Sequence, residues 1–291
     1  MTLIRLGTRG SPLALVQAGM VRDALIAGHG VDVEIVIIKT TGDVVQDRPL
    51  AEIGGKALWT KELDRALLGG EIDCAVHSMK DVETIRPAAI TIAAMLPRED
   101  VRDRLIGAAS IADLPVGATI GTSSPRRRAQ LLRMRPDLKV VMFRGNVDTR
   151  LAKLAAGEAD ATLLAAAGLA RLGRPDVGTA IELDVMLPAP AQGAVGIEAR
   201  TDDGATRALL EILDHPPTHR CVLAERALLA ALQAGCHSPV AALASDDGMI
   251  RAELFAEDGS AHVSGWGNDP AMLARDLLAR APDTIRELFA A

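Results

Sequence analysis

The order of apolar and polar stretches at the start of the chain predicts alternating strands and helices. Residues 3–6 are typical of a short strand, and Ser11 followed by Pro12 supplies a helix N-cap with proline at the first helical position. The predicted helix ends near the glycines of residues 28–30. Residues 31–38 alternate and then become continuously apolar, which predicts a buried strand.

A second strand and helix follow in the same pattern. Residues 57–68 have helical spacing and stop at a glycine pair, and residues 72–76 predict another short strand. That strand delivers residues 77–81, which include Lys80 and Asp81, at its carboxyl end. Ligands of open α/β sheets bind at the carboxyl ends of strands, so this placement marks a candidate site.

Residues 118–165 repeat this pattern. The predicted order is a strand at 118–121, a helix opened by Ser124 and Pro125, a strand at 139–143, a helix ending at Gly157 and a strand at 161–165. We interpret the two blocks as α/β domains that face each other, each offering an anion-binding helix N-terminus to a shared cleft. Residues 94–104 and 187–197 are expected to be the crossovers between them.

The pattern changes from about His215. A helix is predicted at 218–232, then three short strands separated by turns at 246–248 and 257–259, and two final helices, the first opened by Asp269 and Pro270. This is a small α+β domain with a three-stranded antiparallel sheet. The expected domains are residues 1–97 with 190–213, residues 98–189, and residues 214–291.

Composition narrows the class of protein. The chain of 291 residues is 49% hydrophobic and 24% charged, as a folded protein with a sizeable core would be. No apolar run approaches the about 20 residues that span a membrane. Arg5 and Arg9 stand where a signal peptide would be apolar, and the three cysteines are too sparse for a disulfide framework. We therefore expect a cytoplasmic protein.

The charge pattern points to a small polyanionic ligand. The net charge of −6 and the aromatic content of 2% argue against nucleic-acid binding. Arginine outnumbers lysine 26 to 6, which compositional bias could produce, but bias would not concentrate arginines at the mouths of strand-to-helix turns. Arg9, residues 126–128, Arg144 and Arg150 all lie in such segments. A guanidinium beside a helix N-terminus suits carboxylates or phosphates.

Asp81 is the main candidate for a catalytic residue, and Arg126 and Arg127 are the main candidates for binding an anionic ligand. Residues 77–81 could also be an ordinary polar loop. Asp81, next to Lys80 and the arginines, should stay ionised and could stabilise a developing cation or move a proton. Successive helical side chains are about 100° apart, so we expect Arg126 and Arg127 to face the ligand and Arg128 to be solvated or salt-bridged.

Cys236 is the better candidate for covalent chemistry, because it follows a helix stop and lies in a predicted loop. Cys74 and Cys221 belong to strand and helix patterns and are expected to be inert core residues. The histidines are scattered and no CxxC pair occurs, so no metal site is expected. The chain also lacks a Walker loop and a dinucleotide fingerprint.

Several longer motifs resemble those of the porphobilinogen deaminase family, also called hydroxymethylbilane synthase. They occur in family order from the first strand into the third domain: TRGSPLAL (residues 8–15), HSMKD (77–81), GTSS (121–124), RGNVDTR (144–150), PAQGAVGIE (190–198) and GC (235–236). The family fold resembles the two-domain periplasmic binding proteins, with a third domain that carries the cofactor.

The resemblance implies a specific reaction and site. The family joins four porphobilinogen molecules head to tail, with loss of ammonia, and releases hydroxymethylbilane. A dipyrromethane cofactor is thioether-linked at the position of Cys236, and Asp81 is expected to hold pyrrole N–H groups and stabilise the azafulvene-like intermediate. A monomer is expected. The implied cofactor- and substrate-binding residues are Arg9, Ser11, Lys56, Trp59, Lys80, Thr122, Ser123, Ser124, Arg126, Arg127, Arg144, Gly145, Asn146, Arg150, Arg171 and Gln192.

The chain departs from the family pattern at Glu52, where some members have lysine, and Trp59 keeps a stacking surface where phenylalanine is common. Two other functions fit the same residues less well. One is a two-domain binding protein for a polyanionic small molecule, which fold analogy alone does not distinguish from an enzyme. The other is an enzyme acting on a phosphate ligand, for which the chain lacks a glycine-rich phosphate loop and an acidic metal site.

Overall fold

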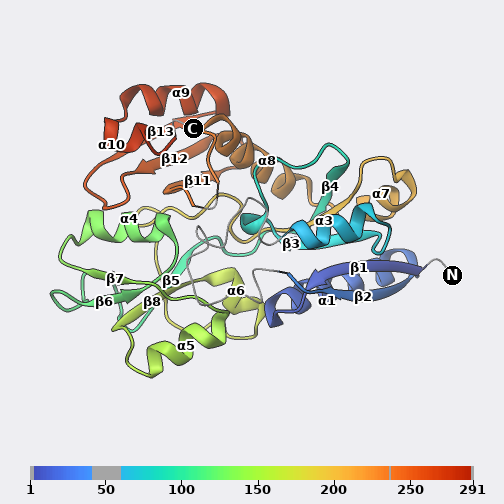
Figure 1. Cartoon of the computed structure of the whole chain (residues 1–291), viewed down its shortest axis with the longest axis horizontal. Helices are drawn as coiled ribbons and strands as arrows, with labels where there is room; N and C mark the ends of the chain where they lie inside the picture. The colour runs from blue at the N-terminus through green and yellow to red at the C-terminus, as the bar shows by residue number, and fades with distance from the viewer. Residues whose placement is uncertain (1–2, 41–59, 236, 290–291) are drawn as a thin grey trace. The chain divides into compact units, whose positions relative to one another are not determined.

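The computed structural model describes residues 3–40, 60–235 and 237–289. The chain divides into two compact units. Figure 1 shows the whole chain, coloured from blue at the N-terminus to red at the C-terminus. Unit 1 comprises Met1–Arg98 and Gly193–His219, and unit 2 comprises Glu99–Gln192 and Arg220–Ala291. The finer division into three domains stays a prediction. No helix among the described residues is long and apolar enough to span a bilayer.

Unit 1 is built on a five-stranded mixed sheet. Its strands lie in the order β2 (Asp32–Ile38), β1 (Leu3–Arg9), β3 (Cys74–Ser78), β10 (Val195–Arg200) and β4 (Ile90–Met95). β1 is parallel to β2 and β3, whereas β10 is antiparallel to both β3 and β4. Among the described residues, the α-helices that pack on this sheet are α1 (Pro12–His29), α3 (Lys61–Leu68) and α7 (Gly204–Glu211).

The two faces of this sheet are covered by different helices because successive strand side chains point to opposite faces. Leu6 and Val76 pack in one cluster with Val21 and Leu25 of α1. Ala75 points the other way and packs with residues of α3, in a cluster formed by Leu63, Ala66, Leu67, Ile72, Ala75 and Ile90. The carboxyl ends of β1 and β3 therefore emerge beside the start of α1.

The strand and the helix predicted at the start of the chain are confirmed as β1 and α1. Ser11 caps α1 with its hydroxyl, and the helix ends at Gly30, whose φ of 61° is left-handed. The strand predicted at residues 31–38 is confirmed as β2, but its predicted burial is wrong, because β2 is the edge strand of its sheet and Ile37 is 53% exposed. Sequence patterns also missed β10, which begins inside the predicted crossover at residues 187–197.

Unit 2 contains a second five-stranded sheet, as the repeated pattern predicts. The strand order is β7 (Lys139–Val141), β6 (Thr119–Gly121), β8 (Ala161–Ala165), β5 (Asp103–Ile106) and β9 (Thr179–Ala180). β6 is parallel to β7 and β8, and β5 runs antiparallel to β8 and β9. The helices that follow β6, β7 and β8 are α4 (Pro125–Met134), α5 (Val147–Ala155) and α6 (Ala166–Arg171).

The C-terminal region forms the predicted three-stranded antiparallel sheet. It contains α8 (Pro216–Ala231), β11 (Val240–Ala244), β12 (Ile250–Phe255), β13 (His262–Gly267), α9 (Pro270–Arg280) and α10 (Asp283–Arg286). Leu228, Leu254 and Leu277 join α8, β12 and α9 in one apolar core. α9 packs against β13 (Figure 1), and the Asp269 carboxylate caps it by accepting from two backbone N–H groups. The expected fold class, two α/β sheets and a small α+β region, is confirmed.

Candidate active site

Asp81 lies directly beyond the carboxyl end of β3, as predicted. The strand ends at Ser78, and the short 3₁₀ helix η2 (Met79–Asp81) follows it. The backbone N–H of Met79 donates to Ala194 O over 3.1 Å. The Met79 side chain fills the space beside Gly196, where an added Cβ would lie 2.1 Å from its sulfur. The absence of a side chain at residue 196 therefore allows the turn to sit against β10.

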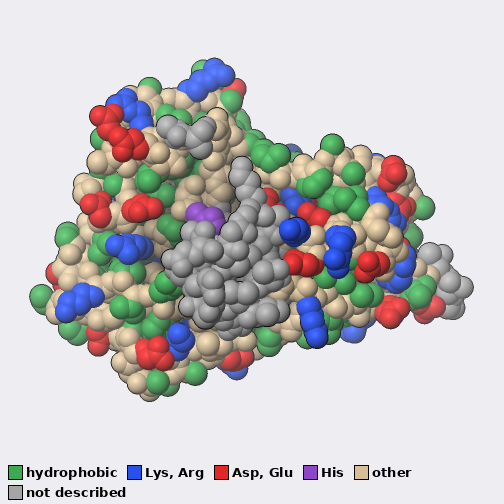
Figure 2. All heavy atoms as spheres, viewed as in Figure 1, with side chains coloured by type: hydrophobic (Ala, Val, Ile, Leu, Met, Phe, Trp, Pro, Cys, Tyr) green, Lys and Arg blue, Asp and Glu red, His purple; other side chains and the backbone are tan. Residues whose placement is uncertain are grey.

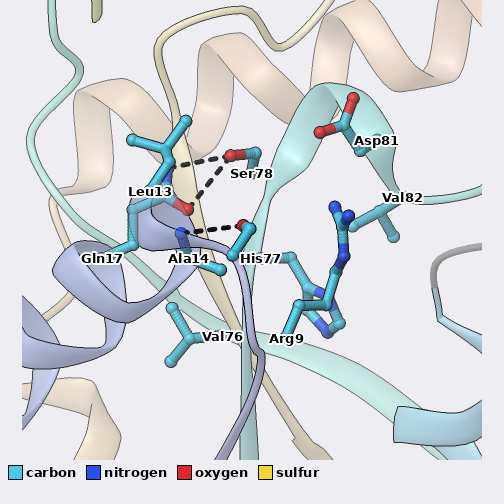
Figure 3. Close-up of a pocket in the computed structure, with 10 residues that line it drawn as sticks. Arg9, Leu13, Ala14, Gln17, Val76, His77, Ser78, Asp81 and Val82 are labelled. Carbon is cyan, nitrogen blue, oxygen red and sulfur yellow. Dashed lines mark hydrogen bonds between the residues drawn. The ribbon is translucent and has the colours of Figure 1, made fainter. Parts of the chain in front are cut away.

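The turn forms one wall of a small pocket within unit 1. The pocket measures about 60 Å³, and Figure 3 shows its lining residues: Arg9, Ser11, Leu13, Ala14, Gln17, Val76, His77, Ser78, Asp81 and Val82. A water needs about 10–15 Å³ by the same measure, so the pocket has room for a carboxylate group but not for a whole tetrapyrrole. The structure thus brings together Arg9, Ser11 and Asp81 of the predicted site.

Hydrogen bonds hold the floor of this pocket. The Ser11 hydroxyl accepts from Ala14 N over 3.3 Å at the start of α1. Gln17 Nε2 donates to Ser78 Oγ over 2.8 Å, and Ser78 Oγ lies 3.1 Å from Gln17 Oε1, so α1 is joined to the end of β3. In Figure 3 the Arg9 side chain extends toward the turn that carries Asp81. The pocket therefore combines a cation, a helix N-terminus and a carboxylate.

A buried ionic cluster lies under the same turn. Glu198 of β10 is fully buried; its Oε2 atom lies 3.2 Å from His77 Nε2, and both its oxygens accept from Arg86 over 2.8 Å. Arg86 also donates to Asp64 and Glu83. Burial alone would raise the pKa of Glu198, but His77 and Arg86 outweigh it and lower that pKa to about 2. Glu198 is therefore an ionised, fully enclosed carboxylate.

Unit 2 contains the predicted arginine pair, Arg126 and Arg127, in the first turn of α4. Arg126 and Arg127 are only 3% and 4% exposed, and each donates to one oxygen of Asp103 over 2.7 Å. Their other Nη atoms donate to the carbonyls of Leu187 and Leu163. Both guanidiniums thus point toward Asp103, because the buried carboxylate requires counter-charges.

Asp103 is the centre of this second cluster. Gln192 Nε2 donates to Asp103 Oδ1 over 2.9 Å and to Val101 O over 2.7 Å. Burial disfavours the charged form of Asp103, but the two guanidiniums hold its pKa well below the usual range. The exposed Arg128 agrees with its predicted position in solvent. Ligand contacts of Arg126, Arg127 and Gln192 stay predictions.

The other candidates of unit 2 lie at helix starts. Ser124 caps α4 by accepting from Arg127 N, and Thr122 Oγ1 accepts from Ser124 N. Asn146 caps α5 by accepting from Thr149 N over 2.9 Å. The half-buried residues Ser123, Arg144 and Arg150 lie in the same two segments, and Arg171 lies at the end of α6.

Backbone conformation also shapes the segment before α5. Gly145 has a φ of 107°, and a Cβ there would lie 2.6 Å from the Thr149 side chain, so glycine is required. Arg150 Nε donates to Gly145 O over 3.0 Å, which ties the first turn of α5 to this glycine. Burial lowers the pKa of Arg171, with Glu99 acting in the opposite sense.

The remaining predicted residues lie outside the described part of the chain or away from the pocket. Lys56, Trp59 and Cys236, together with the departure at Glu52, lie outside the described residues. Lys80 is half-buried within η2 but is not part of the pocket lining. Cys74 and Cys221 are buried, as predicted, and burial raises the pKa of the Cys74 thiol to about 12.

Sequence reasoning missed Gln17, Arg86, Asp103 and Glu198. A signal existed for Glu198, which is the only charged residue of the apolar stretch 193–199 and so marks a buried, paired carboxylate. The burial of Asp103 is harder to predict, because Asp103 belongs to a run of charged residues that is typical of an exposed loop. Figure 2 shows one face of the molecule, on which charges of both signs are interspersed among the described residues.

The sequence matches two models of known protein families, which together cover most of the chain. The family described as "Porphobilinogen deaminase, dipyromethane cofactor binding domain" matches residues 4–208, and "Porphobilinogen deaminase, C-terminal domain" matches residues 219–276. A solved periplasmic substrate-binding protein of an ABC transporter from Coxiella burnetii aligns at 16% identity with a TM-score of 0.44, covering 76% of this chain and 94% of that chain.

The curated relatives cover nearly the whole chain. The porphobilinogen deaminase of Sphingopyxis alaskensis is 59% identical, with 99% of this chain and 96% of that protein covered. That of Paracoccus denitrificans is 52% identical, with coverage of 96% and 95%. The chloroplastic porphobilinogen deaminase of Oryza sativa subsp. japonica is 52% identical, with coverage of 89% and 76%. The chain therefore belongs to the porphobilinogen deaminase family.

Proposed function

We propose that this protein is a hydroxymethylbilane synthase, which condenses four porphobilinogen molecules head to tail. At each condensation the C–N bond of an aminomethyl group breaks and ammonia leaves. The methylene carbon then bonds to the free α-carbon of the pyrrole that ends the growing chain, and that carbon loses its proton. At the end a hydroxyl from water replaces the bond between the first methylene carbon and the protein-bound pyrrole, whose α-carbon regains a proton, and the linear tetrapyrrole leaves. The observation that carries the proposal is Asp81 at the end of β3, in one pocket with Arg9 and the start of α1.

Asp81 is the residue that we propose for the chemical step. Departure of ammonia leaves positive charge on the pyrrole ring, and a fixed carboxylate beside the ring stabilises that charge. The same carboxylate can accept the pyrrole N–H. Because the turn that carries Asp81 is anchored to β10 through Met79, the carboxylate is held in place before substrate arrives.

The acetate and propionate groups of the substrate explain the cationic residues. In unit 1, the Arg9 guanidinium and the N-terminus of α1 suit a carboxylate. In unit 2, Ser124 and Asn146 cap the starts of α4 and α5, and Arg144 and Arg150 lie just before and within the first turn of α5. We propose that the predicted binding residues hold these carboxylates, with Arg126, Arg127 and Gln192 supporting them from the Asp103 cluster.

The donor set also fits the dipyrromethane cofactor, which we propose is attached through Cys236. Arginines, hydroxyls and free helix N–H groups are the partners that a chain of pyrrole carboxylates requires, and Cys74 and Cys221 are enclosed. When bound, the cofactor supplies the pyrrole terminus that is extended. We further propose a monomer that acts in the reducing cytoplasm, consistent with three sparse cysteines.

The intact mass of the denatured protein tests this proposal. A mass increase equal to a dipyrromethane, located on the peptide that holds Cys236, is expected, and Cys236→Ser should abolish it. Asp81→Ala should retain the fold and lose nearly all turnover of porphobilinogen, whereas the exposed Asp23→Ala on α1 serves as a matched control with normal turnover. An unmodified chain that binds porphobilinogen without converting it would favour the binding-protein function instead.

A further inference from the structure

Both ends of the segment that carries Asp81 lie against one buried carboxylate: Arg86 is hydrogen-bonded to it, and His77 is in contact with it. His77 precedes Asp81, and its Nε2 atom lies 3.2 Å from Glu198 Oε2. Arg86 follows Asp81 and donates through Nε and Nη2 to the two oxygens of Glu198, each over 2.8 Å. Glu198 lies on β10, a different strand. The segment 77–86 is therefore a loop closed at its base by Glu198, which we call the Glu198 clamp.

The strand register explains why Glu198 reaches the first end of this loop. In the antiparallel pairing of β10 with β3, Glu198 lies opposite Ala75 and Gly196 lies opposite His77. Ala75 and His77 point to the same face, so His77 is a diagonal neighbour of Glu198. A glutamate at this position of β10 can thus contact the histidine that leads into the turn.

The second end is held more firmly. Arg86 donates to Asp64 of α3 over 3.1 Å and to Glu83 over 3.0 Å, in addition to Glu198. Its side chain is only 9% exposed, and Glu198 has no exposed surface. Enclosed charges of this kind hold one geometry, because separating them would leave each of them buried without a partner. The arginine therefore keeps the far end of the loop against β10.

We propose that Glu198 is a positioning residue, which fixes Asp81 for the reaction by holding both ends of its loop. This inference rests on the proposed function, since Asp81 matters only if it acts on substrate. Glu198 is enclosed and does not line the pocket, so it acts through the loop and not by touching the ligand. A shift of about 1 Å in a reacting group can reduce a rate about 100-fold.

Glu198→Gln tests the clamp, because it preserves the shape of the side chain and removes its charge. We expect kcat for porphobilinogen consumption to fall about 10- to 100-fold, with KM changed less than about twofold and the cofactor mass retained. Amide hydrogen exchange should rise in the peptide spanning residues 78–86. His77→Gln loosens one end only and should give a smaller change in the same direction.

Asp73→Asn is the matched control. Asp73 accepts three hydrogen bonds from Arg5 and precedes β3 at the end of the strand away from Asp81. This variant should lower the melting temperature without changing kcat or exchange in residues 78–86. Wild-type kcat and exchange in Glu198→Gln, with only a lower melting temperature, would overturn the positioning role. A wild-type protein that does not consume porphobilinogen would instead overturn the proposed function, while hydrogen exchange would still test the clamp.

Discussion

Asp103→Asn is expected to lower stability strongly, because it removes the charge at the centre of a buried cluster. The native carboxylate is 1% exposed and accepts one guanidinium on each oxygen, from Arg126 and Arg127 over 2.7 Å. Asparagine has the same shape but no charge, and its amide nitrogen must face one of the guanidiniums. Two like charges would then lie close together in an enclosed site without a counter-ion.

The magnitude follows from the burial of the cluster. Removing one partner from a buried ion pair costs about 3–5 kcal/mol, because the remaining charge is left unpaired. For a folded body of 150–250 residues, about 1 kcal/mol lowers the melting temperature by about 2–4 °C. We therefore expect Asp103→Asn to lower the melting transition of unit 2 by about 6–20 °C.

Calorimetry of the full chain, with urea unfolding as a second measurement, checks this value. Asp137→Asn is the matched control, because Asp137 also accepts two hydrogen bonds from one arginine, Arg135, but at the surface. Exposed pairs contribute little to stability, so the control should change the transition far less. Equal melting temperatures for Asp103→Asn and Asp137→Asn would refute the argument that burial makes loss of the Asp103 charge costly.

Three further predictions concern pH, thiol reactivity and backbone conformation. The pKa of Glu198 is about 2 in the folded protein, against an ordinary 4.5. Its ionised form therefore adds about 3 kcal/mol to the free energy of unfolding above about pH 4.5, and this contribution is lost as pH falls toward 2. A plot of the free energy of unfolding against pH should be flatter over this range for Glu198→Gln than for the native protein. Cys74 and Cys221 should not react with a maleimide until the protein unfolds, and native labelling of either, located by peptide mass, would contradict their burial. Gly145→Ala should reduce stability by at least about 1 kcal/mol in urea unfolding, because its left-handed φ and the contact with Thr149 both disfavour a Cβ, whereas Gly204→Ala, with open space at its Cβ position, should be tolerated.

The ion clusters also show which parts of the site depend on distant segments. His77 and Arg86 meet Glu198 only because β10 enters the unit 1 sheet between β3 and β4. Arg126 and Arg127 turn inward only because β5 brings Asp103 to the enclosed side of α4. Neither arrangement leaves a periodic pattern in the sequence, since the partners are far apart along the chain. For this reason the sequence contains no sign that the two arginines pair with Asp103.

The sequence by itself determined the features that depend on a few neighbouring residues. Ser11, Ser124 and Asp269, each followed by proline, predicted three helix starts, because a side-chain cap needs only a backbone N–H two or three residues away. The antiparallel C-terminal sheet and the place of Asp81 after a strand followed from local patterns too. Only the tertiary structure decided strand order, the edge position of β2 and the pairing of buried charges, because these depend on which distant surfaces exclude water together.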